Sequence, residues 1–182
     1  MNITVIGRGH VGGGLAQLWR TAGHDVQELG RDGGDASDAD AIVVAVPWAQ
    51  IGDALGKVQG IEGKVAIDAT NAYGGRPEEF ESLAHWVKSI VGGPVAKSFN
   101  LNFATLYDRI AAEPEPPGNL FAAEDDARET AEQLIRDAGY DPVYVGGLDQ
   151  ARVLEDSLGL VFAVAQAGLG QYFYRFAPPK TR

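Results

Sequence analysis

Cysteine is absent from this sequence of 182 residues. Its absence excludes a disulfide framework, a thiolate nucleophile and any metal site that uses cysteine ligands, and it fits a reducing compartment. No charged and apolar leader precedes the first β-branched run, so we expect no signal peptide. The longest apolar run, residues 158–164 and their continuation, falls short of the roughly 20 residues that span a bilayer. We therefore expect a cytoplasmic protein without membrane association.

An excess of positive charge is also missing. The formal net charge is −10 at pH 7, whereas a protein that follows a phosphate backbone needs a basic surface. We expect no nucleic-acid partner, and any anionic ligand has to be held by a few local groups. The chain has 45% hydrophobic residues, which is enough for one main core and a small appendage.

Motifs for acid–base chemistry by protein groups are missing as well. The sequence has no Tyr-x-x-x-Lys motif and no lysine and glutamate constellation that suggests a hydroxyacid-dehydrogenase base, and His24 and His85 stand alone. We expect no metal ligands and no catalytic acid or base. A hydride that passes directly between two bound rings needs neither, because the cofactors carry that chemistry and the protein orients them.

Strands and helices alternate over the first 100 residues. Apolar periodicity predicts helices at residues 11–22, 51–58 and 77–90, and short apolar runs predict strands at residues 2–6, 25–29, 41–46, 64–69 and 95–99. This order indicates an α/β fold of the Rossmann type, with a doubly wound, mostly parallel sheet and right-handed crossovers. Residues 30–40 are too few for a full crossover helix with its turns.

The second half of the chain adds strands and a final helix. A loop with three prolines, residues 113–118, precedes predicted strands at 119–123 and 141–145 and an amphipathic helix at 125–138. The last helix, about residues 149–167, is almost wholly apolar after Ser157, so it should be buried in this chain or against another. We expect a dinucleotide-binding domain over residues 1–148. The C-terminal segment, residues 149–182, should contribute to a homodimer and to the substrate pocket.

A glycine-rich turn follows the first strand and opens the first helix, with the sequence Gly7-Arg8-Gly9-His10-Val11-Gly12. In such a turn the first glycine permits the tight bend, the second lets the backbone approach a pyrophosphate, and the third lets helix and strand pack closely. We expect these six residues to form a dinucleotide site, in which His10 lies near phosphate rather than acting in catalysis. The alternative is a glycine turn that no longer binds a nucleotide.

The end of the second strand normally decides between NAD and NADP. An acidic residue there binds the ribose 2′-hydroxyl, whereas a cation accommodates a 2′-phosphate. Here Gly30 and Arg31 occupy that place, so we favour NADP over NAD. Glu28 and Asp32 flank this place, and an acidic residue there would favour NAD instead. The alternative is that Arg31 is a solvated loop cation.

Polar and aromatic residues follow the third, fourth and fifth strands at the edge where ligands of open α/β sheets bind. Val46, Pro47 and Trp48 end the third strand, and Trp48 offers either a flat surface for a ring or a side chain packed on the next helix. Asn71 follows the fourth strand, and Asn100 and Leu101 follow the fifth. These amides could bind a nicotinamide carboxamide or a second ligand.

In these features the sequence resembles the NADP-dependent oxidoreductases typified by NADPH:coenzyme F420 oxidoreductases. The Rossmann domain of that family is also similar to those of pyrroline-carboxylate reductases and membrane metalloreductases. The matching segments span nearly the whole chain: residues 3–12, 23–26, 45–48, 68–71, 97–100 and 152–155. The resemblance implies that NADP lies against His10, Val11, Arg31, Pro47, Trp48 and Asn100.

The same resemblance implies where the acceptor binds. A deazaflavin such as coenzyme F420, or another small redox acceptor, would stack near Asn100, Leu101 and the C-terminal helix. This sequence departs from the family at two points: it lacks the helix after the second strand, and it has Gly30 where a small polar residue is usual.

Three functions remain open. The first is an NADP-dependent oxidoreductase that transfers hydride directly to a deazaflavin-like compound, a flavin, a metal chelate or another small acceptor. The second is a non-catalytic dinucleotide-binding or sensing protein, which the missing helix favours. The third is a pyrroline-carboxylate-type imine reductase, but such an enzyme needs a long helical dimerisation domain, and the residues after 149 are too few.

Overall fold

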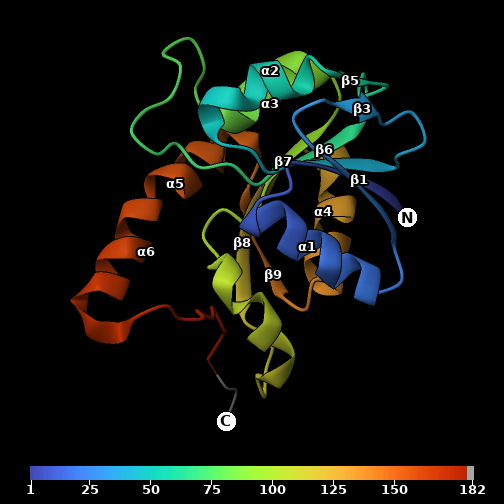
Figure 1. Cartoon of the computed structure of the whole chain (residues 1–182). Helices are drawn as coiled ribbons and strands as arrows, with labels where there is room; N and C mark the ends of the chain where they lie inside the picture. The colour runs from blue at the N-terminus through green and yellow to red at the C-terminus, as the bar shows by residue number, and fades with distance from the viewer. Residues whose placement is uncertain (180–182) are drawn as a thin grey trace.

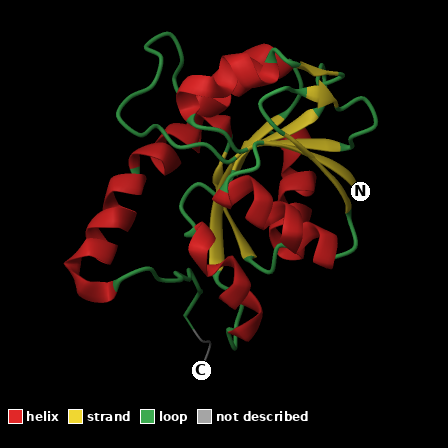
Figure 2. Ribbon diagram, viewed as in Figure 1, coloured by secondary structure: helices red, strands yellow, loops and turns green. Residues whose placement is uncertain are grey.

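A seven-stranded sheet forms the centre of the protein in a computed structural model that describes residues 1–179 (Figure 2). The last three residues of the predicted C-terminal segment, 149–182, lie outside the described part. The strand order is β2 (Asp25–Leu29), β1 (Asn2–Ile6), β4 (Ala41–Val44), β6 (Val65–Asp68), β7 (Val95–Lys97), β8 (Gly118–Ala123) and β9 (Asp141–Gly146).

The first five strands of that order run parallel. Strand β8 is antiparallel to β7, and β9 is parallel to β8. The doubly wound, mostly parallel sheet predicted from the sequence is thus confirmed. In such a sheet the carboxyl ends of β1, β2, β4, β6 and β7 meet at one edge, where the candidate site residues follow.

Helices cover both faces of the sheet (Figure 1). Side chains of α1 (His10–Thr21) and α4 (Asp125–Asp137) form a core on one face, and those of α2 (Ile51–Leu55), α3 (Leu83–Val91) and α5 (Ala151–Asp156) form a core on the other. The central strand β4 is therefore buried on both sides, and all four of its side chains are inaccessible to solvent. Its continuous apolar run is the pattern of a strand buried between two layers.

No helix connects β2 to β4. The chain instead turns back at Gly30, whose carbonyl accepts a hydrogen bond from the amide of Gly33 at 3.2 Å. It then forms a short strand, β3 (Gly34–Asp35), which pairs with β5 (Val58–Gln59). The prediction that residues 30–40 cannot hold a crossover helix is confirmed. The tip of β2 is consequently open to solvent instead of being covered by a helix.

Several predicted elements are shorter than the sequence indicated, among them the strand predicted at 95–99, which ends at Lys97. Helix α3 begins at Leu83 and not near residue 77, because Ser82 caps it by accepting a hydrogen bond from the amide of His85 at 3.2 Å. Phe80 has helical spacing but lies in the preceding loop, where its ring stacks on Trp86 at 5.9 Å. The predicted helix 51–58 ends at Leu55 because Val58 joins a strand, and the predicted strand 41–46 ends at Val44.

The C-terminal segment is a broken helix. Helix α5 is followed by α6 (Leu158–Val164) and a wider turn (Ala165–Leu169), and this arm extends outward from the body of the molecule (Figure 1). No residue of α6 is buried, and Leu160 and Leu169 are 68% and 63% exposed. The apolar end of this segment is therefore not buried within this chain. None of the helices in residues 1–179 is both long and apolar enough to cross a membrane.

We expect Gly12→Ala to lower the free energy of unfolding. A Cβ atom at Gly12 would lie 2.0 Å from the carbonyl oxygen of Gly7, so helix α1 would have to move away from strand β1, at a cost of about 1–3 kcal/mol or more. Urea unfolding followed by circular dichroism measures the change. Gly9→Ala is the control, because a Cβ atom at Gly9 meets nothing within 4 Å and should cost less than about 1 kcal/mol. Equal losses in the two variants would contradict the packing argument.

Candidate dinucleotide-binding site

The glycine turn places the N-terminus of α1 at the carboxyl edge of the sheet. Gly7 has a φ of +116°, a conformation that favours glycine, and its amide donates to the carbonyl of Leu29 at 3.0 Å. Gly9 is the N-cap residue, so no side chain caps the helix, and the first turn carries no acidic residue. The first amides of α1 and the helix dipole are therefore available to an anion.

A cavity of about 580 Å³ opens beside this turn. It is bordered by the glycine turn, by the tip of β2 and by the segment that follows β4. Seven of the residues predicted for the cofactor site line it: Gly7, Arg8, Gly9, Gly30, Arg31, Val46 and Pro47. Gly12 is buried beneath it, in contact with Gly7.

Two arginines and two carboxylates border this cavity. Arg8 donates through Nε and Nη2 to the carbonyl oxygen of Glu28, at 3.2 and 2.8 Å. The carboxylate of Glu28, which made the sequence ambiguous, is paired with Arg20 at 2.7 Å. Of the two lining carboxylates, Asp53 is paired with Lys57 at 2.8 Å. The other lining carboxylate, Asp32, makes no ion pair within the described residues, so Arg8, Arg31 and Asp32 are the unpaired charged groups of the cavity.

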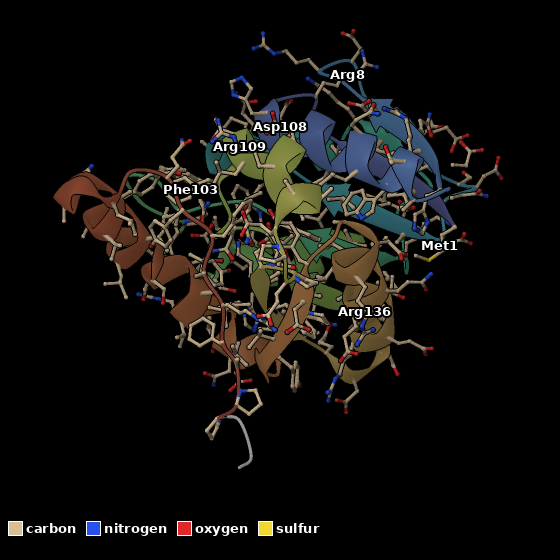
Figure 3. The ribbon with its side chains drawn as sticks, turned by 90° about the horizontal axis from the view of Figure 1, so that it is seen from below. Met1, Arg8, Phe103, Asp108, Arg109 and Arg136 are labelled. Carbon is tan, nitrogen blue, oxygen red and sulfur yellow. The ribbon has the colours of Figure 1, made fainter. Side chains whose placement is uncertain are left out.

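A second cavity, of about 230 Å³, lies on the other side of the α1 N-terminus. It contains the remaining predicted residues His10, Val11, Asn71, Asn100 and Leu101. Its aromatic lining comes from three separate segments of the chain: Tyr73, the pair Phe99 and Phe103, and Phe162. Figure 3 shows Arg8 at the outer edge of the molecule and Phe103 beside the C-terminal arm, so the residues of the two cavities face different parts of the surface.

Trp48 lines neither of these two cavities. Its indole nitrogen donates to the carbonyl of Tyr73 at 2.7 Å, and its ring packs against the core under α2 and α3. Of the two roles considered for Trp48, a flat surface for a ligand ring or a side chain packed on the next helix, its position fits the second. Trp48 anchors the loop between β6 and α3, which brings Tyr73 to the second cavity.

Asn71 and Asn100 are in direct contact in the second cavity. Asn71 Nδ2 donates to the Asn100 carbonyl at 2.8 Å, and Asn100 Nδ2 donates to Asn71 Oδ1 at 3.1 Å and to the carbonyl of Leu154 at 3.2 Å. Asn100 is only 4% exposed, yet its Oδ1 has no hydrogen-bond partner in the described part of the chain. A buried acceptor without a donor is costly, so this oxygen is suited to a ligand N–H or O–H group.

The backbone before Asn100 is strained. Phe99 has a φ of +61° and is the single non-glycine residue with positive φ within residues 1–179. Asn119 holds this turn from β8, since its Oδ1 accepts from Ser98 Oγ at 2.9 Å and from the amide of Phe99 at 3.4 Å. Strained backbone that the surroundings hold in place is frequent at ligand sites.

A buried ionic network lies beneath the two asparagines, and the sequence analysis missed it. Lys97 Nζ is 2.8 Å from Asp68 Oδ2, 3.2 Å from Glu155 Oε1 and 2.6 Å from the carbonyl of Thr70. A lysine and glutamate pair was considered only as a catalytic base, and this buried arrangement of Lys97 with Glu155 was not foreseen. The three charged residues are far apart in the sequence, and two of them, Asp68 and Lys97, stand alone at the ends of apolar runs. That placement of a charged residue was the available signal.

The network is inaccessible, so it holds elements together rather than reacting with substrate. The Lys97, Asp68 and Glu155 side chains are all 0% exposed. Burial raises the pKa of Glu155, while the nearby Lys97 ammonium opposes that shift. Glu155 also accepts from the amide of Leu83 at 2.8 Å and lies 3.2 Å from Arg76. It thereby joins α5 to the N-terminus of α3 and to the β6–α3 loop.

Comparison with solved structures shows the same architecture in several nucleotide-dependent proteins. A protein from Arthrobacter sp. fb24, named for a suggested F420-dependent NADP reductase activity, superposes with a TM-score of 0.78 and 20% identity, over 98% of this chain and 99% of that one. This chain therefore has a Rossmann-type fold. The resemblance drawn from the sequence is thus confirmed at the level of the fold.

Longer reductases share the fold over part of their length. The imine reductase of Streptomyces aurantiacus matches with a TM-score of 0.66 and 16% identity, over 92% of this chain and 63% of that one. A reductive aminase from Aspergillus terreus, in complex with NADPH and ethyl levulinate, matches with a TM-score of 0.68 and 13% identity, over 92% and 63%. No protein-family model matches the sequence. No curated protein matches it either.

We expect Lys97→Met to destabilise the protein strongly. The substitution leaves the Asp68 and Glu155 carboxylates buried without their cation, and breaking one partner of a buried ion pair costs about 3–5 kcal/mol. Thermal and urea unfolding measure the loss. Lys57→Met is the matched control, because the exposed Lys57–Asp53 pair should contribute no more than about 0.5 kcal/mol. A similar, small effect of both substitutions would argue against the network as a structural anchor.

Proposed function

We propose that this protein is an NADP-dependent oxidoreductase that transfers hydride directly between nicotinamide and a second redox cofactor or small acceptor. The observation that carries the proposal is the pair of cavities on either side of the α1 N-terminus. One is bordered by Arg8 and Arg31, and the other by paired asparagines and aromatic rings. NADP has two matching ends: an anionic 2′-phosphate on the adenosine ribose, and a planar nicotinamide ring.

The residues present fit such a cofactor. The pyrophosphate would lie over Gly7, Gly9 and Gly12, against the α1 amides and beside Arg8, His10 and Val11. The 2′-phosphate would lie in the larger cavity near Gly30 and Arg31, and Val46 and Pro47, which line the same cavity, would border the nucleotide on its way to the nicotinamide end. Trp48 would support this segment through its packing and its hydrogen bond to Tyr73 rather than by touching the nucleotide. Asn71 and Asn100 would face the nicotinamide carboxamide, and the free Asn100 Oδ1 is the acceptor such an amide needs.

When bound, NADP would supply the hydride chemistry itself. The chain's own contribution would be to orient the two rings and to exclude water, since amides and aromatic side chains line the second cavity. Holding two reactants in the correct geometry is a large part of catalysis by such a site. His10 also lines this cavity, and at the N-terminus of α1 we assign it to the phosphates rather than to proton transfer.

The acceptor would bind near Asn100 and Leu101, under the C-terminal arm. Leu158, Val161 and Phe162 of α6 line this cavity, and the ring of Phe162 packs on Phe103 at 6.1 Å. Aromatic side chains favour a flat or apolar acceptor. Coenzyme F420 is one candidate because it appears in the name of a protein with the same fold over the full length, and flavins and metal chelates are others.

We also propose that residues 149–182 form a separate C-terminal element, distinct from a dinucleotide-binding domain at 1–148, and that it pairs two subunits in a homodimer. The apolar outer face of the arm supports this, since Leu160 and Leu169 are largely exposed. Large apolar side chains grouped on one surface favour association. Sedimentation velocity tests the proposal, and a monomer at all concentrations would contradict it.

Turnover with a panel of acceptors tests the function. We expect the purified protein to bind NADPH more tightly than NADH and to oxidise NADPH with at least one of coenzyme F420, a free flavin or a ferric chelate. Absorbance at the NADPH band follows the oxidation, and calorimetry measures the binding. Binding without oxidation by any acceptor would instead support a non-catalytic dinucleotide sensor.

We expect Phe162→Ala to weaken the acceptor and not NADPH. The substitution removes an aromatic wall of the second cavity, so KM for the acceptor should rise about tenfold, as for the loss of one aromatic contact of roughly 1–1.5 kcal/mol. Val153→Ala is the control, because Val153 is exposed on α5 and does not line this cavity. An equal loss of NADPH affinity in the Phe162 variant would place the nicotinamide, and not the acceptor, against α6.

A further inference from the structure

We infer that Arg8, which lies between the first two glycines of the glycine turn, is the principal ligand of the NADP 2′-phosphate and determines selectivity over NAD. The inference rests on the proposed NADP site and names a residue that determines its specificity. The contact that selects NADP over NAD is thereby assigned to Arg8 in the glycine turn instead of to Arg31, two residues after the end of β2.

The guanidinium of Arg8 lies across the tip of β2. Its Nε and Nη2 donate to the Glu28 carbonyl oxygen, at 3.2 and 2.8 Å. A Cβ atom built on Gly30 would lie 3.5 Å from the Arg8 Cζ and 3.6 Å from its Nη1. The guanidinium therefore occupies the space beside Gly30, at the strand end whose residues contact the ribose 2′-position in this kind of fold.

The charge of Arg8 is oriented but not neutralised. A guanidinium has five N–H groups, and the Glu28 carbonyl takes two of them, so three remain for a ligand. No carboxylate in residues 1–179 forms an ion pair with Arg8, whereas the nearby Glu28 is paired with Arg20 and Asp53 with Lys57. A fixed, planar cation with free donors matches the oxygens of a phosphate.

Arg31 lines the same cavity but is not held in place. Both arginines are exposed, but within the described residues the Arg31 side chain makes no hydrogen bond or ion pair with the rest of the chain. Fixing a free arginine on a ligand costs side-chain entropy, which the anchored Arg8 has already lost on folding. The missing helix after β2 removes other phosphate ligands from this end of the site, so Arg8 takes their place.

Binding of nucleotide fragments tests this inference without any redox step. Calorimetry compares adenosine 2′,5′-bisphosphate with 5′-AMP, which lacks the 2′-phosphate. We expect Arg8→Ala to weaken the bisphosphate about 10- to 100-fold, the range for lost charge-assisted hydrogen bonds, and to change 5′-AMP less than about threefold. Arg31→Ala is the matched control and should lose less of the bisphosphate affinity. Circular dichroism checks that both variants fold.

A reciprocal substitution tests the role of the gap at Gly30. Gly30→Asp places a carboxylate against the Arg8 guanidinium, where it would pair with that cation and repel a 2′-phosphate. We expect the preference of the protein to move from NADPH toward NADH by at least tenfold. Gly30→Ala adds the Cβ atom without the charge and should leave the preference within about threefold.

Several outcomes would overturn the inference. Equal losses of both fragments in the Arg8 variant would make Arg8 a ligand of the 5′-phosphate side, and a larger loss in the Arg31 variant would return selectivity to Arg31. A wild-type protein that binds NADPH and NADH equally would also refute it, while leaving dinucleotide binding intact. Failure of every acceptor to oxidise NADPH refutes the proposed enzyme alone, because the fragment affinities do not depend on turnover.

Discussion

The buried ammonium of Lys97 is the interaction on which the geometry of the site depends. Its partners come from two elements: Asp68 and the Thr70 carbonyl from the end of β6, and Glu155 from α5. Through Glu155 the same network reaches the first amide of α3. A charge buried in this way is tolerated only when its partners are in place. The network therefore fixes the loops that carry Asn71 and Asn100, and it fixes where the C-terminal arm leaves the body.

A second constraint acts at the glycine turn, where backbone contact replaces side-chain contact. The approach of Gly12 to the Gly7 carbonyl sets the distance between α1 and β1, and so sets the position of the α1 N-terminus between the two cavities. The glycine turn borders the larger cavity, and the Lys97 network lies beneath the asparagines of the second cavity. A site that orients two rings needs this rigidity more than it needs a reactive side chain.

Much of the fold could be predicted because its signals are local. The apolar run of β4 and the glycine turn before α1 each depend on a few neighbouring residues. The start of α3 could not be predicted in this way. Phe80 has the spacing of a helical residue, but it lies in a loop and its ring packs on Trp86. The Lys97 network and the Trp48 anchor depend on contacts between segments distant in sequence. Single-sequence patterns do not report such contacts.

The C-terminal arm has one side in the second cavity and an apolar side exposed to solvent. Phe162 and Leu160 are separated by less than one helical turn, so one short helix carries both surfaces. If the proposed subunit contact on the outer side shifts α6, it changes the proposed acceptor site with it. Thermodynamic linkage would then make association and acceptor binding alter each other's equilibrium constants by the same factor.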